Sequence, residues 1–306
     1  MKKRRFLLSL TTNDNDYQME QAVSAAEMAR REAVDLEIIY ADNDAINQSQ
    51  QLLKVIQASS ESRPDAIIFE PAGSTGLPQV ARAALTAGIG WVILNREVDY
   101  ISGLRNSYSS TPIFCLTSDH KEIGRIQGKQ IAALVPHEGS ILYIQGPSGS
   151  DAAQQRTDGM QQTKPPNIQV RMVRAQWTEG SAYQAVSAWL RLSTSRSSHL
   201  DAIIAQDDSM AMGARKAFEE IADIQLRERW LEVPFTGCDG MPKTGQAWVR
   251  SGLLAGTVIV PANAGTAVEM LAKSMQTGTI PPERTFVDVR SYPPLEELSA
   301  RRIRRS

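Results

Sequence analysis

Short apolar runs alternate along this chain with longer segments in which apolar residues recur at helical spacing. The first half contains four such runs, which predict β-strands at Phe6–Leu10, Leu36–Tyr40, Ala66–Phe69 and Trp91–Leu94. A helix is predicted after the first strand at Gln18–Arg31, and the residues expected on its buried face are Met19, Ala22, Val23, Ala26 and Ala29. This alternation is typical of βαβ units and a parallel sheet.

The same pattern begins again in the second half. Four further strands are predicted at Ile141–Ile144, Val170–Arg174, Ala202–Ala205 and Phe235–Cys238. Helices are predicted at Lys121–Leu134, Ala152–Gln162, Ser181–Leu192 and Met210–Ile221. Between the two sets, Ser102–Pro112 is rich in Ser, Gly and Asn and is expected to be a surface loop or crossover. A last run, Leu254–Val260, and the helix Ala264–Gln276 are too short to form a sheet and are expected to join an existing one.

Length and composition agree with two compact lobes. The chain has 306 residues, more than one core usually holds, and 42% hydrophobic with 22% charged residues indicate a globular protein rather than a disordered or membrane-spanning one. A net charge of -1 gives no basic footprint for nucleic acid, and the basic ends Lys2–Arg5 and Arg301–Arg305 are expected to be solvated tails. The run Phe6–Leu10 is shorter than the roughly 7–15 apolar residues of a secretory signal, so a first strand is expected there rather than a signal peptide.

Polar residues follow the predicted strands at their carboxyl ends, where the loops and helix N-termini of a parallel sheet converge. In the first half these residues are Asn15, Tyr17, Glu70, Asn95 and Arg96. In the second half they are Gln145, Gly146, Trp177, Gln206, Asp207 and Asp239. Carboxylates accept hydrogen bonds from hydroxyls, arginines donate to them, and aromatic rings cover the C–H surface of a pyranose. The mixture therefore favours a neutral polyol.

Several of these residues also have a simpler structural interpretation. One residue of Asp14–Asp16 is expected to cap the following helix, and Asp208 or Ser209 could cap the helix that holds Met210. At Asp207, helix capping and ligand contact are equally favoured interpretations. Taken alone, Trp177 would be expected in the core and Arg156 on a solvated helix face.

The cysteines and histidines give no sign of catalysis. Cys115 and Cys238 lie far apart and outside any CxxC pattern, so buried free thiols are expected. We expect the three histidines to be exposed at helix ends or in loops: His120, His137 and His199. The sequence has neither a glycine-rich dinucleotide loop after its first strand nor a GxxxxGK[ST] motif. We therefore expect a protein that is not an enzyme, with no catalytic residue, metal or cofactor.

A series of motifs runs in order through nearly the whole chain. They are Asp65–Pro71, Val92–Arg96, Ser118–Asp119 with Gly124 and Gly128, Gln145–Gly146 with Ala152–Ala153 and Arg156, Ala205–Ala214 and Gly237–Gly240. In this order and spacing they resemble the type 1 periplasmic sugar-binding proteins similar to ribose-binding protein. That family shares its fold with the ligand domains of lactose-repressor-type regulators.

The resemblance implies an α/β fold of two Rossmann-like lobes with parallel sheets. Three crossovers would link the lobes, near Ser118–Asp119, Ile259–Val260 and Glu283–Arg284. The N-terminal lobe would comprise residues 1–118 plus 260–283, and the C-terminal lobe residues 119–259 plus 284–306. Carried over by position, the implied ligand contacts are Asn15, Tyr17, Gln18, Glu70, Asn95, Arg96, Arg156, Trp177, Asp207 and Asp239.

The implied function is capture of a small polyhydroxylated ligand, foremost a monosaccharide, in a cleft between the lobes that closes on it for ABC-type sugar uptake. The expected partner is a membrane transporter or a sensor, and a monomer that binds no nucleic acid is expected in the periplasm or cell envelope. The alternatives are a cytoplasmic ligand-sensing domain without a DNA-binding headpiece and, less favoured, a Rossmann-type enzyme.

Departures from the family pattern argue against taking ribose itself as the ligand. Glu70 stands where an asparagine is common, and Asn95 replaces the usual aspartate. The other departures are Gln18 and Cys238 at aromatic positions and Ile259 or Val260 where a glutamine is expected.

Overall fold

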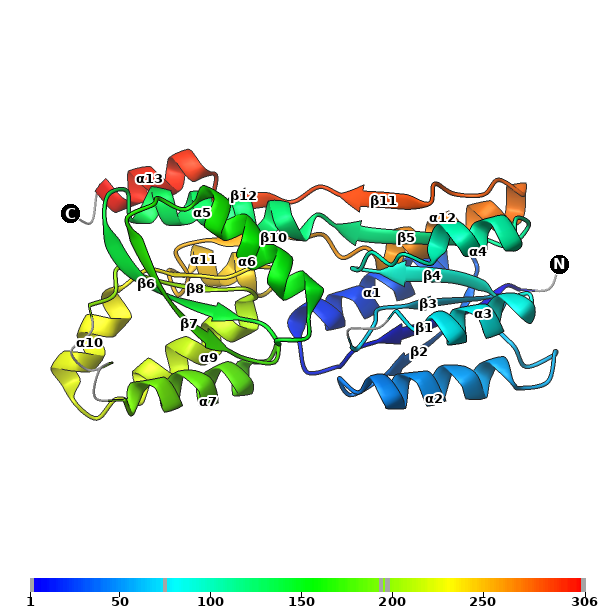
Figure 1. The fold of residues 1–306 in the computed structure, drawn as a ribbon, viewed down its shortest axis with the longest axis horizontal. Coiled ribbons are helices and arrows are strands. Elements are labelled where there is room, and N and C mark those ends of the chain that lie inside the picture. Colours follow the sequence, from blue (N-terminus) through cyan, green and yellow to red (C-terminus); the bar gives the residue numbers. More distant parts are fainter. Residues whose placement is uncertain (1–2, 74–75, 193–194, 196–198, 304–306) are drawn as a thin grey trace. The chain divides into compact units, whose positions relative to one another are not determined.

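The computed structural model describes residues 3–73, 76–192, 195 and 199–303, so parts of both basic ends lie outside the described residues. The chain divides into two compact units (Figure 1), the first comprising Met1–Ser118 and Ala262–Val287 and the second Asp119–Pro261 and Asp288–Ser306. Two boundaries differ from those expected at 259/260 and 283/284. One reason is that Arg284–Val287 form a strand, β11, which pairs with a strand of the first unit.

The first unit is built on a six-stranded parallel sheet with the order β11-β5-β4-β3-β1-β2. Its other strands are β1 (Arg5–Leu10), β2 (Asp35–Tyr40), β3 (Ala66–Phe69), β4 (Gly90–Leu94) and β5 (Ile113–Ser118). Its helices are α1 (Asp16–Arg31), α2 (Ala45–Ile56), α3 (Pro78–Thr86), α4 (Ile101–Ser107) and α12 (Ala264–Thr277). The predicted α/β class with parallel sheets is confirmed.

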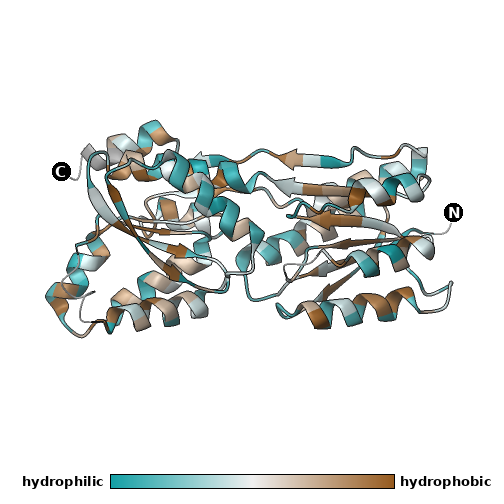
Figure 2. Cartoon of the chain, viewed as in Figure 1, coloured by the Kyte–Doolittle hydropathy of each residue, from teal (hydrophilic) through white to brown (hydrophobic). Residues whose placement is uncertain are grey.

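Successive strand residues of this sheet enter two different cores, because side chains alternate between the faces of a strand. Leu8 packs on one face with residues of α1 and α12, and Leu7 packs on the other with residues of α2 and α3. Both faces are therefore covered, which explains why the strands are continuous apolar runs. Figure 2 shows hydrophobic residues concentrated in the strands of each unit.

The second unit contains a four-stranded parallel sheet with the order β7-β6-β8-β9, and a two-stranded antiparallel sheet of β10 and β12. The strands are β6 (Gly139–Gln145), β7 (Ile168–Arg174), β8 (Ala202–Ala205), β9 (Phe235–Thr236), β10 (Thr257–Ile259) and β12 (Arg290–Tyr292). The helices are α5 (His120–Leu134), α6 (Asp151–Thr163), α7 (Glu179–Leu190), α9 (Asp208–Glu219), α10 (Ile224–Glu232), α11 (Gly245–Arg250) and α13 (Leu295–Ile303). No helix within the described ranges is both long and apolar enough to cross a membrane.

Two predicted segments differ from the structure. The expected loop Ser102–Pro112 mostly overlaps α4, because Ile101 and Leu104, spaced one helical turn apart, are buried in the core of the first unit. The run Leu254–Val260 forms β10, whose ladder partner is β12 rather than a strand of a parallel sheet. Isolated parallel bridges, one of them from Asp239 to Ile259, connect this run to the segment that starts with β9.

The buried face of α1 is the predicted one only in part: Ala29 is buried and Ala22 packs against the core, as expected, but other positions differ. Met19 and Val23 are 55% and 45% exposed, whereas Gln21 is fully buried. Gln21 Nε2 donates to Asn263 Oδ1 at 2.9 Å, and its Oε1 accepts from the backbone N–H of Ala264 at 2.7 Å. These bonds tie α1 to the start of α12, so a buried amide with satisfied hydrogen bonds faces the interior where the apolar pattern had placed Met19 and Val23.

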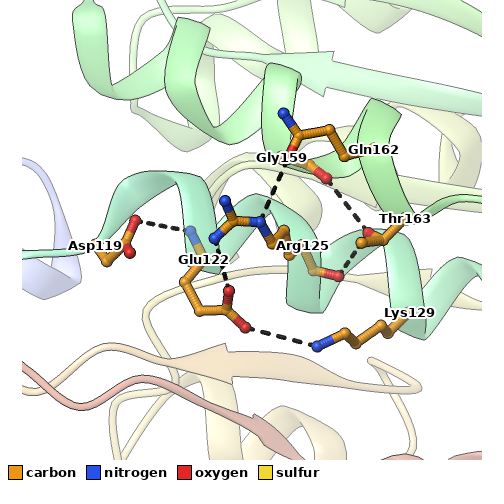
Figure 3. Close-up of polar contacts among 7 residues, drawn as sticks. All are labelled: Asp119, Glu122, Arg125, Lys129, Gly159, Gln162 and Thr163. Atoms are coloured by element: carbon orange, nitrogen blue, oxygen red, sulfur yellow. Dashed lines mark hydrogen bonds and ion pairs between the residues drawn. The ribbon is translucent and has the colours of Figure 1, made fainter.

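Helices α5 and α6 pack backbone to backbone within the second unit. A Cβ at Gly124 would lie 2.0 Å from the carbonyl oxygen of Arg156, and a Cβ at Gly159 would lie 2.0 Å from a carbonyl oxygen of α5. Beside this contact, Thr163 Oγ1 donates to the carbonyl of Arg125 at 2.8 Å (Figure 3). The close approach fixes the position of Arg156 on α6.

Replacing Gly159 by alanine is expected to lower the free energy of unfolding by at least about 2 kcal/mol, because the added methyl meets backbone that cannot turn away. The matched control is Gly180→Ala, since a Cβ at Gly180 in α7 meets nothing within 4 Å. Thermal unfolding measures both variants. Equal midpoints for the two would contradict the packing described.

Candidate functional site

Three predicted ligand residues of the first unit come together in a cluster that we call the first polar cluster: Tyr17, Glu70 and Asn95. The hydroxyl of Tyr17 donates to Asn95 Oδ1 at 3.2 Å, and Asn95 Nδ2 donates to Glu70 Oε2 at 2.9 Å. The three residues lie beyond the carboxyl ends of β1, β3 and β4. Asn95 has a φ of 54°, a left-handed conformation that asparagine adopts more readily than most residues.

Two residues that sequence reasoning missed lie against this cluster. Asn263, fully buried, donates from Nδ2 to Asn95 Oδ1 at 2.8 Å, and Gln21 Nε2 donates to the Tyr17 hydroxyl at 3.1 Å. Gln21 follows Tyr17 by four positions, so the shared helix face was a usable signal. Asn263 had no comparable signal, because it comes from a distant part of the chain.

The remaining predicted residues of the first unit surround the cluster. Asn15 caps α1 by accepting from the N–H groups of Tyr17 and Gln18 at 2.9 and 3.2 Å, which confirms that a residue of Asp14–Asp16 is the cap. Gln18 accepts from the N–H of Thr11 at 3.2 Å and so fastens the loop after β1. Arg96 is partly buried directly after Asn95.

Arg156 is the centre of the second polar cluster, which also contains Trp177, Asp207 and Asp239. Only 7% of Arg156 is exposed, so the expected solvated helix face is wrong. Its guanidinium donates to the carbonyl of Gln206 and lies 5.4 Å from the ring centroid of Trp177. Trp177 is partly buried, and a Cβ at Gly146 would meet its ring at 2.3 Å, so this glycine leaves room for the indole.

The charge of Arg156 is compensated locally. Burial by itself lowers the pKa of Arg156, but neighbouring groups outweigh this effect and raise it, among them Asp239 and Asp207. Cys238 also lies close, but burial raises the pKa of its thiol well above the ordinary value, so the thiol is neutral at pH 7. The two carboxylates therefore supply the compensating charge.

The two neighbouring aspartates at the start of α9 have different roles. Asp207 caps the helix by accepting from the N–H of Met210 at 2.5 Å, so the expected cap at Asp208 or Ser209 is wrong. Asp208 is 2% exposed and accepts from Thr257 Oγ1 and from the N–H of Gly240, both at 2.7 Å. Its carboxylate thus holds the turn that contains Asp239, whose φ of 107° is strained for a residue with a side chain.

Gln206, directly after β8, supports the second polar cluster. Its Nε2 donates to the Tyr143 hydroxyl and to Thr157 Oγ1 at 2.9 and 3.0 Å, and its Oε1 accepts from the N–H of Gly146 at 2.9 Å. The fully buried side chain thus connects β6 with α6, and the backbone carbonyl of the same residue accepts from the Arg156 guanidinium.

Both cysteines are free and buried, as predicted. Burial raises the pKa of Cys115 to about 12 and that of Cys238 well above its ordinary value. Since the thiolate is the reactive form, we expect a disulfide reagent at pH 8 to modify neither thiol of the folded protein and both in denaturant. At pH 8 the Cys115 thiol would therefore be almost entirely protonated. A rapidly titrating thiol in the folded protein would contradict this burial.

The histidines are not gathered into a reactive group. His137 and His199 are exposed as predicted, but His120 is buried at the first position of α5. Across the part of the chain that the structure describes, no three His, Cys, Asp or Glu side chains are grouped so that they could hold a metal ion.

Comparison with known proteins agrees with this fold. The family described as "Periplasmic binding protein domain" matches residues 6–279, and the chain belongs to it. A D-apiose import binding protein from Paraburkholderia graminis is 26% identical over 285 residues, covering 90% of this chain and 83% of that protein. A relative from Rhizobium meliloti is 29% identical over 194 residues, covering 61% of this chain and 58% of the relative.

A solved structure shares the fold over its whole length. It is an ABC transporter periplasmic solute binding protein from Actinobacillus succinogenes with bound D-allose, with a TM-score of 0.79 and 22% identity. The alignment covers 97% of this chain and 100% of that one. The family resemblance seen in the motifs is confirmed, and the family is one of binding proteins.

Proposed function

We propose that this chain binds a small polyhydroxylated ligand, foremost a monosaccharide, as the solute-binding component of an ABC-type uptake system. One observation carries the proposal: the carboxyl edge of each parallel sheet gathers an aromatic ring, a carboxylate and hydrogen-bond donors. In the first unit these are Tyr17, Glu70 and Asn95, followed by Arg96. In the second they are Trp177, Asp207 and Asp239 with Arg156. The names of the relatives, which bind D-apiose and D-allose, support the same class of ligand.

Both units are proposed to contribute contacts to the ligand. The residues assigned to this role are Asn15, Tyr17, Gln18, Glu70, Asn95, Arg96, Arg156, Trp177, Asp207 and Asp239. Such a site gains little from apolar burial and must satisfy each polar group, so removing one ligand hydroxyl should cost about 1–3 kcal/mol. Discrimination between epimers of one sugar would follow.

A thermal-shift panel of sugars, polyols and sugar acids tests the proposal. A ligand that binds only the folded chain raises the unfolding midpoint by mass action, and a concentration of 100 times Kd adds about 2.7 kcal/mol. We expect one stereochemical series to respond and its epimers to respond weakly. A panel without any response would count against a sugar or polyol ligand.

The proposal includes release of the ligand unchanged, in a monomeric protein that acts in the periplasm or cell envelope beside a membrane transporter. The net charge of -1 supports the absence of a nucleic-acid partner. Chromatography of the bound sugar after incubation tests whether the ligand is released unchanged. Light scattering of the purified chain tests whether it is a monomer, and cell fractionation tests its location. A converted sugar would revive the enzyme alternative.

A further inference from the structure

Two backbone groups determine the donor and acceptor directions of the hydrogen bonds in the first polar cluster. A side-chain amide can present either its oxygen or its nitrogen, whereas a backbone N–H only donates and a backbone carbonyl only accepts. The N–H of Ala264 donates to Gln21 at 2.7 Å, and the carbonyl of Leu116 accepts from Asn263 at 3.2 Å. These two groups fix which end of each amide faces which neighbour.

The orientation of the Gln21 amide determines the orientation of the Asn263 amide. Because the oxygen of Gln21 faces the Ala264 N–H, its nitrogen faces Asn263 Oδ1 at 2.9 Å. The nitrogen of Asn263 must then point the other way, which is what the Leu116 carbonyl also requires. Two independent anchors thus give Asn263 the same orientation.

The orientation of the Asn263 amide in turn determines that of the Asn95 amide. Its Oδ1 accepts from Asn263 Nδ2 at 2.8 Å and from the Tyr17 hydroxyl at 3.2 Å, so its nitrogen faces Glu70 Oε2 at 2.9 Å. Gln21 and Asn263 are both fully buried, where a reversed amide would leave a buried donor or acceptor without a partner.

We propose that Asn263, held by Gln21, is a positioning residue that keeps the Asn95 amide turned so that its nitrogen supports the Glu70 carboxylate as the acceptor for a ligand hydroxyl. Asn263 acts through Asn95 and does not itself contact the ligand. The ligand part of this inference rests on the proposed function. The orientation of the amides does not, so it can be tested in the ligand-free protein.

A double-mutant cycle tests the orientation. In Asn263→Asp a carboxylate faces the Leu116 carbonyl and the Asn95 oxygen, so Asn95 must reverse and bring its oxygen to Glu70. Glu70→Gln supplies an N–H for that reversed oxygen. We therefore expect N263D to lower the thermal midpoint of the ligand-free protein by about 5 °C, and E70Q to recover at least half of this loss. In the wild-type background, E70Q is expected to bring no such gain.

Gln51→Glu is the matched control. Gln51 lies in the same unit and donates to the backbone carbonyl of Tyr40 at 3.0 Å, apart from the hydrogen bonds that join Gln21, Asn263 and Asn95. E70Q should not recover the midpoint of Q51E. The same effect of E70Q in wild type, N263D and Q51E would overturn the proposal. If N263D does not fold, Gln21→Glu enters the same cycle, because it keeps the acceptor for Ala264 and removes the donor to Asn263.

A ligand readout separates this inference from the proposed function. With a sugar identified by the panel, N263D should weaken binding at least about tenfold while Q51E leaves it unchanged. Rescue by E70Q without any sugar binding would uphold the amide orientation and reject the sugar ligand. Sugar binding without rescue would reject the orientation and uphold the ligand.

Discussion

Replacing Asp208 by asparagine is expected to lower the free energy of unfolding of the second unit by about 2–3 kcal/mol. The carboxylate accepts from two donors, Thr257 Oγ1 and the Gly240 N–H. An asparagine oxygen can keep the Gly240 bond, but its NH₂ group then faces Thr257 Oγ1, so the hydroxyl must accept and its own proton loses this acceptor. Both contacts also lose the negative charge that strengthens them. The carboxylate is closely surrounded, because a Cβ at Gly237 or Gly245 would lie 2.1 and 1.9 Å, respectively, from its oxygens.

Urea unfolding followed by tryptophan fluorescence measures this effect, since four of the five tryptophans lie in the second unit: Trp177, Trp189, Trp230 and Trp248. The midpoint should fall by about 1 M. Asp223→Asn is the matched control, because Asp223 caps α10 at an exposed site where asparagine serves equally well. If the two variants unfold at the same urea concentration, Asp208 does not hold the turn.

Replacing Arg156 by methionine should weaken the affinity for the panel's best ligand about 100-fold. The guanidinium compensates Asp207 and Asp239, so its loss leaves two carboxylates repelling each other in the site. It also removes the charged donor beside the Trp177 ring, and a hydrogen bond to a charged group contributes about 1.5–3 kcal/mol.

The control for this variant is Arg171→Met, which removes an exposed guanidinium from β7 of the same unit. Titration calorimetry at pH 7 compares the two, and circular dichroism establishes that both are folded. Arg171→Met should bind like wild type. An Arg156→Met protein that binds within threefold of wild type would remove Arg156 from the site.

The sequence predicted the buried strands well, because strands covered on both faces are continuous apolar runs. The predictions Ala66–Phe69 and Ala202–Ala205 coincide with β3 and β8. It did not predict β11, whose residues Arg284–Val287 are half-buried or exposed and carry no apolar run. The strand expected at Phe235–Cys238 is shorter because Gly237 lies against Asp208, where the chain leaves the ladder.

The candidate site was predictable where its residues follow strand ends, but not where it depends on buried amides. Tyr17, Glu70 and Asn95 each follow a predicted strand, and the structure brings them into hydrogen-bond contact. Gln21 and Asn263 are of residue types that usually lie at the surface, and only their tertiary contacts reveal them as buried. Apolar periodicity wrongly placed Met19 and Val23 of α1 inside, because it gives no weight to an amide that finds partners.

Calorimetric titration of the wild-type chain with the best ligand of the panel tests the central claim most directly. We expect one ligand per chain, and affinities at least about tenfold weaker for both Glu70→Ala in the first unit and Arg156→Met in the second. Glu27→Ala, which removes an exposed carboxylate from α1, should bind like wild type. Saturable binding that neither Glu70→Ala nor Arg156→Met weakens, or no heat with any sugar or polyol, would contradict the account.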